Sequence, residues 1–207
     1  MPKLPTIVFS KKLQAKLGTL AVFMAENGEL PNSLQDVEGY ERVAEAVDIA
    51  TFKGAAGSHV SVVAPGGGLD RIVVLGIGKP DEADEEAWLK VGGKLLISAE
   101  KSSDVTVVTD LSDGVLLNAG QLAAIAAGAR LRAYDFDNYK TRKKANNNND
   151  EGNGDISKIT FVTEDESAAK KAWKSMDGIA DGVMFARDLV NEPANILGPV
   201  EFAERAA

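Results

Sequence analysis

The sequence predicts an α/β fold of three layers, in which helices cover both faces of a mixed sheet. Short β-branched runs alternate with longer segments whose apolar residues recur every three or four positions, and this alternation is typical of layered α/β domains. Glycine-rich punctuation between two runs predicts a hairpin, which requires some antiparallel pairing. With 207 residues and 44% hydrophobic content, the chain can bury one sizeable core.

In the first half of the chain, β-branched and large apolar residues predict four strands. These are Thr6–Phe9, Thr19–Met24, His59–Ala64 and Arg71–Gly76. Between the last two lies Pro65–Asp70, which contains the glycines of the predicted hairpin. A helix is predicted over Asp36–Ala50, because its apolar residues fall on one face at three- and four-residue steps.

From residue 80 onward, the predicted helices are Pro80–Lys101, Val115–Arg132 and Ala168–Val190. Proline and four acidic residues open the first of these, small residues in the second indicate close backbone packing, and the third has a broad apolar surface. Strands are predicted at Val105–Thr109, Tyr134–Arg142 and Ile156–Val162. The asparagine-rich segment Asn146–Asp155 is predicted to be a loop tip.

Composition restricts the chemistry of the chain. There is no cysteine and one histidine, His59, so a zinc site built from thiolates or several imidazoles is excluded and only carboxylate binding of a hard cation is left. The apolar run near the start is too short for a signal-peptide core, and no run reaches transmembrane length, so we expect a cytoplasmic protein without a membrane partner.

The net charge of −8 disfavours nucleic acid as a partner, because affinity for phosphate backbones rests largely on basic residues. One dense basic cluster, Lys140, Arg142, Lys143 and Lys144, stands against that total. It is typical of a solvated strand end, and DNA binding is kept as the alternative.

Several local patterns resemble functional sites but have simpler explanations. Gly76-Ile77-Gly78-Lys79-Pro80 lies where a phosphate would meet free amides, but a third glycine is absent, and the acidic residues that follow would repel an anion. Gly66–Gly68 is interpreted as a connection between strands. The acidic run, Asp81, Glu82, Asp84, Glu85 and Glu86, is interpreted as a solvated helix start instead of a metal site.

Three more patterns receive a structural interpretation. Asp110 and Asp113, around Ser112, lack the remaining ligands of a calcium loop, which favours helix capping. His59 beside Ser58 and Ser61 does not make a catalytic triad, because no orienting acid is identifiable, and we expect a structurally satisfied histidine. Trp88 and Trp173 occur at helical spacing with aliphatic residues, so core packing is expected.

Two ordered motifs connect the chain with a known family. Arg187-Asp188-Leu189-Val190-Asn191-Glu192-Pro193-Ala194-Asn195, followed by Pro199, resembles the segment that joins the two domains of leucyl (cytosol) aminopeptidases. Tyr134 to Lys143 resembles the aromatic and basic strand late in the amino-terminal domain of that family. The resemblance implies a fold similar to macro domains.

The resemblance also implies a division of the chain and a role. Residues 1–165 would form the amino-terminal domain, 166–198 a bridging helix and linker, and 199–207 the start of a catalytic domain. The metal-binding segments of the family do not occur in these 207 residues, so no catalytic, cofactor-binding or metal-binding residue is assigned. The parent enzyme would use two zinc or manganese ions to remove N-terminal residues from peptides, and would assemble as a hexamer.

The prediction is therefore a non-catalytic amino-terminal domain that serves oligomer assembly and access to the catalytic centre of an aminopeptidase. Its expected partners are its own catalytic domain and further copies of itself. The similarity to macro domains leaves one alternative open, a module that binds nucleotides, ADP-ribose or DNA.

Overall fold

A computed structural model describes residues 4–15, 17–99, 102–139 and 156–206 of the chain. Its centre is a six-stranded sheet in the order β1-β6-β5-β2-β4-β3. Neighbouring strands are parallel except β3 and β4, which are antiparallel, so the predicted mixed sheet is confirmed. The strands are β1 (Thr6–Ser10), β2 (Thr19–Ala25), β3 (His59–Gly66), β4 (Leu69–Gly78), β5 (Asp104–Val108) and β6 (Lys158–Val162).

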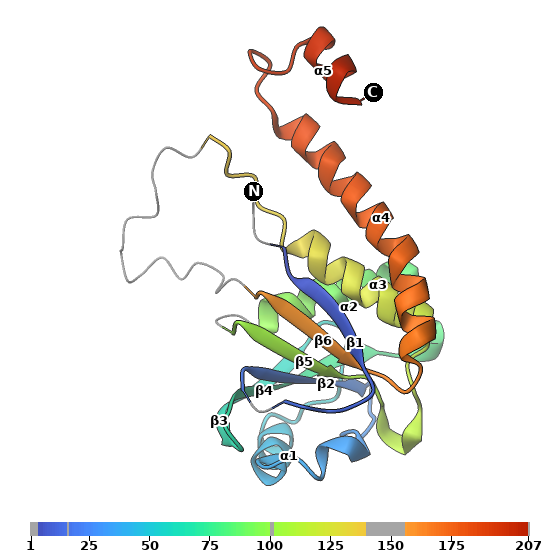
Figure 1. The fold of residues 1–207 in the computed structure, drawn as a ribbon. Helices are drawn as coiled ribbons and strands as arrows, with labels where there is room; N and C mark the ends of the chain where they lie inside the picture. The colour runs from blue at the N-terminus through green and yellow to red at the C-terminus, as the bar shows by residue number, and fades with distance from the viewer. Residues whose placement is uncertain (1–3, 16, 100–101, 140–155, 207) are drawn as a thin grey trace.

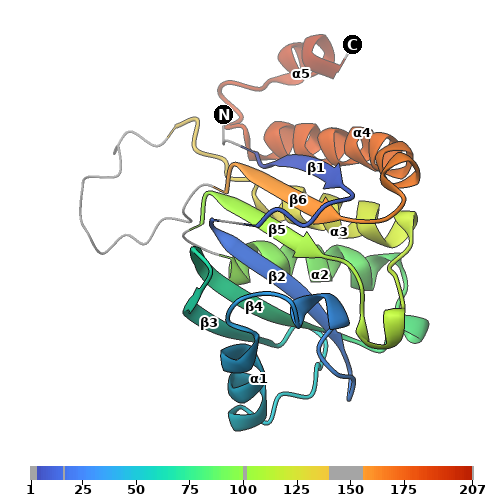
Figure 2. The same ribbon diagram turned by 60° about the horizontal axis from the view of Figure 1, so that its bottom comes forward.

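Helices lie on both faces of the sheet, which gives the three layers expected from the sequence (Figures 1 and 2). One face carries α2 (Glu85–Ser98), α3 (Ala119–Arg132) and α4 (Glu166–Asn191), and the other carries α1 (Tyr40–Ile49). The short helix α5 (Pro199–Ala206) lies beyond the end of α4. Three 3-10 turns complete the described elements, η1 (Asn32–Leu34), η2 (Pro80–Glu82) and η3 (Ser112–Gly114).

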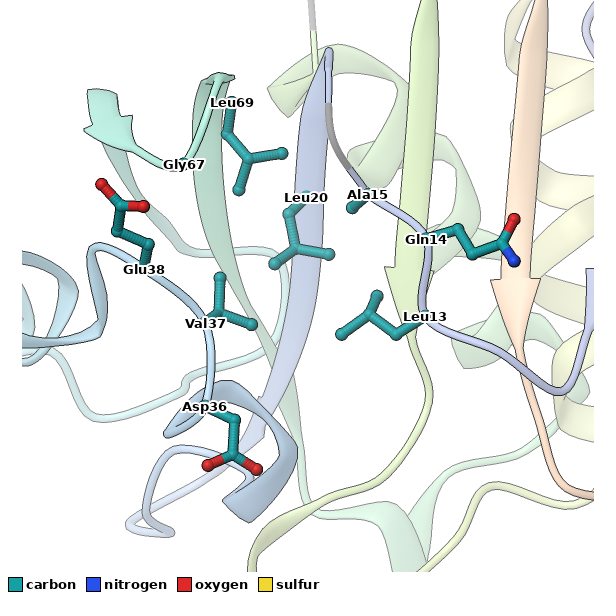
Figure 3. Close-up of a pocket in the computed structure, with 9 residues that line it drawn as sticks. All are labelled: Leu13, Gln14, Ala15, Leu20, Asp36, Val37, Glu38, Gly67 and Leu69. Carbon is teal, nitrogen blue, oxygen red and sulfur yellow. The ribbon is translucent and has the colours of Figure 1, made fainter.

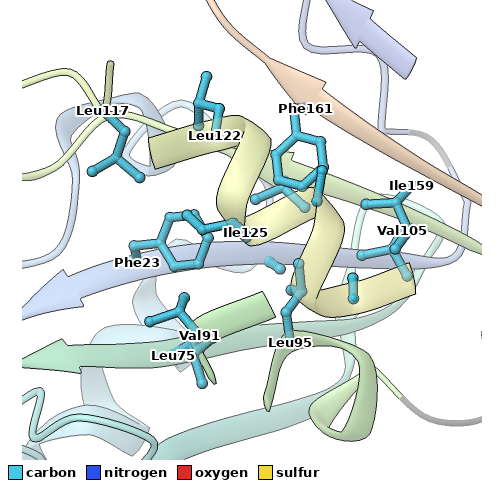
Figure 4. Packing of buried hydrophobic residues seen from close by; sticks show 14 of the residues in the cluster. Phe23, Leu75, Val91, Leu95, Val105, Leu117, Leu122, Ile125, Ile159 and Phe161 are labelled. Carbon is cyan, nitrogen blue, oxygen red and sulfur yellow. The ribbon is translucent and has the colours of Figure 1, made fainter. Parts of the chain in front are cut away.

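Alternate residues of the central strand β2 divide the core into two layers. Ala21 and Phe23 pack toward α2 and α3, whereas Leu20 and Val22 pack toward α1, as the two-residue period of a strand requires. Figure 4 shows the larger layer, in which Phe23 and Phe161 from the sheet meet leucine and isoleucine side chains from the helices. Both sides of β2 are fully buried, so this strand is held in place by the whole domain.

Two glycines allow α2 and α3 to pack against each other at close range. A Cβ atom on Gly92 would lie 1.9 Å from the carbonyl oxygen of Ile125, and one on Gly128 would lie 1.9 Å from that of Leu89. No side chain fits in either place. The close backbone packing expected from the small residues of α3 is therefore confirmed.

Caps move three predicted helix boundaries. The helix expected from Asp36 begins at Tyr40, because Gly39 has φ +97° and breaks the preceding backbone. The helix expected from Pro80 begins as η2, and α2 starts only after Asp84, whose carboxylate accepts a hydrogen bond from the amide of Ala87 at 2.8 Å. The helix expected from Val115 begins at Ala119, where Asn118 and Gln121 form a capping box.

The strand predicted over Tyr134–Arg142 is wrong for the residues that are described. Residues 134–137 run without a ladder partner and a turn follows at Asn138 and Tyr139. Two of the aromatic residues that indicated a strand, Tyr134 and Tyr139, instead bond through their hydroxyl groups to Asp188 on α4 and to Glu192 directly after it. The remainder of that strand, the basic cluster and the loop predicted at Asn146–Asp155 lie outside the described residues.

Candidate functional site

The two sequence motifs meet at the last turns of α4. The hydroxyl group of Tyr134, just after α3, donates a hydrogen bond to Oδ1 of Asp188 at 2.8 Å. The side-chain amide of Asn191 donates to the oxygen of the same hydroxyl group at 3.2 Å and to the carbonyl of Arg187 at 2.9 Å. The hydroxyl group of Tyr134 thus contacts two residues of the motif that begins at Arg187, namely Asp188 and Asn191, which lie almost one helical turn apart.

Arg187 strengthens this contact from the same helix. Its guanidinium group lies over the ring of Tyr134, 5.6 Å from the ring centroid, and donates to the carbonyl of Leu131 at 2.9 Å. Leu131 belongs to the last turn of α3, where carbonyl groups have no helical partner and carry partial negative charge. The arginine therefore ties the C-terminal end of α3 to α4.

Glu192 forms a second junction directly after α4. Its side chain is only 6% exposed, accepts a hydrogen bond from the hydroxyl group of Tyr139, and pairs with Arg205 of α5 at 3.0 Å. The hydrogen bond from Tyr139 and the one from Arg205 lower the pKa of Glu192 below its ordinary value. One carboxylate thus links Tyr139, the linker and α5.

The two tyrosines titrate above their ordinary range. Burial raises the pKa of Tyr134, and its hydrogen bond to Asp188 raises it further. The hydrogen bond to Glu192 raises the pKa of Tyr139. Both hydroxyl groups therefore remain protonated donors at neutral pH, which is the state that the junctions require.

A third anchor lies further back on α4. Arg130 of α3 pairs with Asp177 and, at 3.0 Å, with Asp181, and its guanidinium carbon lies 5.9 Å from the ring centroid of Trp173. The arginine side chain is 16% exposed. Asp177 and Asp181 are four residues apart, so they face the same side of the helix. The middle turns of α4 are thus fixed to α3 as well.

Sequence reasoning singled out both motifs but missed Arg130 and Arg205. A signal for Arg130 was available, because Asp177 and Asp181 interrupt the apolar face of a predicted helix at a four-residue spacing, which indicates a cationic partner on the neighbouring element. No comparable signal exists for Arg205. Its partner, Glu192, is defined only by the course of the chain after α4.

The glycines near the end of β4 do not form a phosphate site. The amide of Gly76 donates to the carbonyl of Ser58 at 2.9 Å, and that of Gly78 donates to the carbonyl of Gly54 at 3.0 Å. A Cβ atom on Gly76 would lie 2.3 Å from the carbonyl oxygen of Ala55. These glycines let the segment before β3 approach the strand, and their amides are already used.

Gly66–Gly68 form the predicted hairpin between β3 and β4. Gly66 pairs with Leu69, which leaves Gly67 and Gly68 as a two-residue turn with φ of +63° and +80°. Positive φ at both positions is the requirement of a type I′ turn. The glycines therefore serve backbone geometry.

The acidic run at the start of α2 is a solvated helix start with local partners. Glu82 pairs with Lys79 at 2.9 Å, Glu86 pairs with Lys90 at 2.8 Å, and Asp84 is the cap. Within the described ranges, no group of three or more histidine or acidic side chains could hold a metal ion. The two divalent metals implied by the resemblance have no ligand set in this part of the chain.

Asp110 caps a helical turn far away in sequence. Its carboxylate accepts from the hydroxyl group of Ser33 at 2.7 Å and from the Ser33 amide at 3.4 Å, in the first turn of η1. This contact joins the segments that leave the carboxyl ends of β2 and β5 toward opposite faces of the sheet. Open α/β sheets bind ligands at such a switch point, and a carboxylate there disfavours a phosphate ligand.

The remaining sequence candidates have structural surroundings. Trp88 is buried in the core at 3% exposure, and Trp173 packs half-buried beside Arg130. His59 is exposed at the start of the edge strand β3, so it is not the internally satisfied histidine that we expected. Asp113 lies in η3.

A pocket of about 300 Å³ lies beside the hairpin on the face that carries α1. Figure 3 shows Leu13, Leu20 and Leu69 pointing into its centre, whereas the carboxylates of Asp36 and Glu38 point away from it. Ligand sites combine an apolar wall with a few convergent polar groups. This pocket lacks the polar part.

A second pocket, of about 390 Å³, lies between α1 and the carboxyl end of β2. Its wall includes Glu29, Asp48 and Lys53 around apolar residues such as Phe52. None of these residues was singled out in the sequence. Charges of both signs share the wall, so it favours neither an anion nor a cation.

No helix in the described ranges is long and apolar enough to cross a membrane. Among the described residues, the anchors around α4 are the best-defined polar contacts. They join elements and hold their geometry.

Comparison with known proteins identifies the fold and the family. The family model for the cytosol aminopeptidase family, N-terminal domain, matches residues 20–143. A probable cytosol aminopeptidase of Chelativorans sp. is 39% identical over 207 residues, which is 100% of this chain and 41% of the relative. One of Rhizobium etli is 40% identical over 201 residues, covering 97% of this chain and 40% of the relative.

Among solved structures, a tomato leucine aminopeptidase mutant shares the fold with a TM-score of 0.75 at 21% identity, covering 99% of this chain and 42% of that one. The chain thus spans about two fifths of the length of these relatives. The matched family model covers the four strands β2 to β5 and the helices α1, α2 and α3, and the Chelativorans relative matches over β1, β6, α4 and α5 as well. The chain belongs to the cytosol aminopeptidase family, whose N-terminal domain it contains.

Proposed function

We propose that this chain is the non-catalytic amino-terminal part of a metal-dependent leucyl aminopeptidase, which removes N-terminal residues from peptides in the cytoplasm. The observation that carries the proposal is the identity of 39% along all 207 residues to a relative named as a probable cytosol aminopeptidase. That relative is more than twice as long as the chain, and the metal-binding segments expected for the family do not occur in these residues. Catalysis is therefore assigned to the rest of the parent protein.

In this proposal, the division of the chain follows the elements. Residues 1–165 form the amino-terminal domain, 166–198 hold the bridging helix α4 and the linker, and 199–207 begin the next domain. The anchors at Arg130, Tyr134 and Glu192 support this division, because they fix the bridge on the domain before the chain leaves it. The domain would serve assembly of a hexamer and shape access to the catalytic centre.

The metals of the proposed parent would supply an activated water and polarise the scissile carbonyl. No group of three or more histidine or acidic side chains that could hold a metal gathers in the described ranges, so in this proposal the ligands come from the rest of the parent protein. The contribution of this chain is to hold α4 and α5 in a fixed geometry.

Enzyme assays test the assignment. The purified 207-residue chain should not hydrolyse leucine amide or leucyl-nitroanilide with added manganese, whereas the protein from the longer reading frame should, and a chelator should stop it. Turnover by the 207-residue chain that survives purification and disappears on substitution of one of its own residues would contradict the proposal.

The nucleotide-binding alternative has its own test. Calorimetry with ADP-ribose should give no saturable heat, since the amides of Gly76 and Gly78 are occupied and the carboxylate of Asp110 lies at the switch point of the sheet. One-site binding would instead favour a ligand-binding module. For DNA, a mobility shift removed by replacing Lys143 and Lys144 would establish a second role.

A further inference from the structure

The distribution of charge along the second half of α4 is inverted relative to an ordinary surface helix. Between Ser175 and Asn191 the charged residues are Asp177, Asp181, Arg187 and Asp188. Each is bound to the domain, through Arg130, the carbonyl of Leu131 or Tyr134. The charged groups of these turns therefore all have partners on the domain, and Asp181 is still 60% exposed.

The opposite side of the same turns is uncharged and exposed. We call it the outer stripe and define it as Gly178, Ile179, Gly182, Phe185, Ala186 and Val190. The side chains of Ile179, Phe185 and Val190 are 59%, 46% and 85% exposed. A helix with one face in solvent normally carries its polar residues there, whereas a helix that is apolar on its outer side is covered by something else. The outer stripe therefore indicates a second contact.

Two glycines give this stripe the form of a helix-packing surface. Gly178 and Gly182 are four residues apart, so they lie on one face, and a Cβ atom on either would meet nothing within 4 Å. Glycine weakens a helix relative to alanine, so open space on its own gives no reason for it. In the same molecule, Gly92 and Gly128 allow two helix backbones to come close. The outer stripe offers a partner the same close approach.

α5 shows the same lack of a partner. It has eight residues, none of them buried, and Val200 and Phe202 are 66% and 48% exposed. An isolated helix of this length is marginal in water, because nucleation is costly. The ion pair from Arg205 to Glu192 ties the last turn of α5 to the residue after α4 but covers no apolar surface. Figure 1 shows α5 beyond the far end of α4, the end where the outer stripe finishes.

We propose that the outer stripe and the apolar side of α5 form one seat for the part of the protein that follows Ala207. This inference rests on the proposed function, since the relatives are more than twice as long as the chain. The continuation is the favoured occupant because α5 leads directly into it. A second copy of this chain is the competing occupant, and the labelling experiment below distinguishes the two.

Because the chain has no cysteine, a single introduced thiol can report whether the seat is covered. Ala186→Cys places a small probe in the stripe with little change in volume, and Asp48→Cys on the exposed side of α1 is the matched control. Labelling by a maleimide, read by peptide mass, is compared between the 207-residue chain and the protein from the longer reading frame. We expect at least tenfold slower labelling of Ala186→Cys in the longer protein and equal rates for Asp48→Cys.

Amide exchange of the unsubstituted proteins provides the second readout, and it does not depend on tolerance of a variant. The amides of α5 should exchange at least tenfold more slowly in the longer protein than in the 207-residue chain. Both readouts must agree, since the stripe and α5 belong to one seat.

Each outcome decides between the two proposals. Equal labelling and exchange in both proteins, with an active longer protein, would overturn the seat and leave the aminopeptidase assignment intact. Protection without activity would support the seat and count against the enzyme. Slow labelling in the 207-residue chain that becomes fast on dilution would show a second copy in the seat, and a reading frame that ends at Ala207 would overturn both proposals.

Discussion

The hydroxyl group of Tyr134 donates a hydrogen bond to the carboxylate of Asp188, 54 residues later, at 2.8 Å. This contact joins the segment that follows α3 to the last turns of α4. Arg187 and Asn191 reinforce it from either side of Asp188. The end of α4 is therefore held by Tyr134, which precedes it by many residues in the sequence, and not by the linker alone.

Removing the Tyr134 hydroxyl group should destabilise the domain modestly. Tyr134→Phe keeps the ring under Arg187 but leaves Asp188 and Asn191 without their shared partner, which should cost about 1 kcal/mol after allowance for solvent. Urea unfolding followed by circular dichroism measures the change. Tyr40→Phe is the control, and an equal loss in both variants would contradict a specific role for Tyr134.

Acid should weaken the Glu192 junction before it unfolds the domain. Hydrogen bonds from Tyr139 and Arg205 lower the pKa of Glu192 in the folded chain, below the ordinary 4.5. The stabilisation from the carboxylate is therefore complete above about pH 4.5 and is lost as the pH falls through the lowered folded-state pKa. Amide exchange in α5 at a series of pH values, corrected for the intrinsic rate, should show the loss.

Glu192→Gln is the matched variant for that experiment. It should exchange faster than the unsubstituted chain at pH 7, and the two should converge in acid, because only the unsubstituted carboxylate has a proton to gain. High salt should reduce the difference at neutral pH, since Arg205 is 41% exposed. A difference that persists below the folded-state pKa would show that ionisation of Glu192 is not the cause.

Replacement of glycine by alanine should destabilise the domain at one pair of helical glycines and stabilise it at another. Gly92→Ala or Gly128→Ala would place a methyl group against a carbonyl oxygen of the facing helix and should cost about 3 kcal/mol or more. Gly178→Ala or Gly182→Ala meets open space in this chain and should stabilise it by up to about 1 kcal/mol. Thermal unfolding of the four variants measures both effects, and destabilisation at Gly182 in the 207-residue chain would contradict the open surface.

Loss of Arg130 should loosen α4 from α3. Arg130→Gln leaves Asp177 and Asp181 without their cation beside Trp173, and the partly exposed site should cost about 1–2 kcal/mol. Trp173 fluorescence should shift to longer wavelength as water gains access. Lys90→Gln, which removes the fully solvated pair with Glu86, should leave both stability and fluorescence unchanged.

Much of the fold follows from period and punctuation in the sequence. The run of β-branched and large apolar residues in β2 and the glycine turn before β4 are local signals, and the structure retains both. Helix starts were missed where the signal is a single cap, as at Gly39 and Asp84, because apolar periodicity continues past the cap on both sides. The hydrophobic pattern does not indicate at which residue the helix begins.

The strand expected at Tyr134 shows where local signals fail. Aromatic residues favour strands because they pack well on a pleated surface, but Tyr134 bonds to Asp188 on α4 and Tyr139 bonds to Glu192 directly after it. Those partners lie more than fifty residues away, and nothing in the sequence near the tyrosines indicates which residues they are. The motifs were recognisable separately, and only the folded chain shows that they contact each other.

The length of α4 has a mechanical consequence. Its 26 residues form a rod of about 39 Å, which is held in its middle through Asp177 and Asp181 and again in its last turns through Arg187 and Asp188. The middle and the last anchors lie about 16 Å apart along the rod. A rod held at two such places cannot pivot freely about either of them, so the direction in which the chain leaves the domain is set.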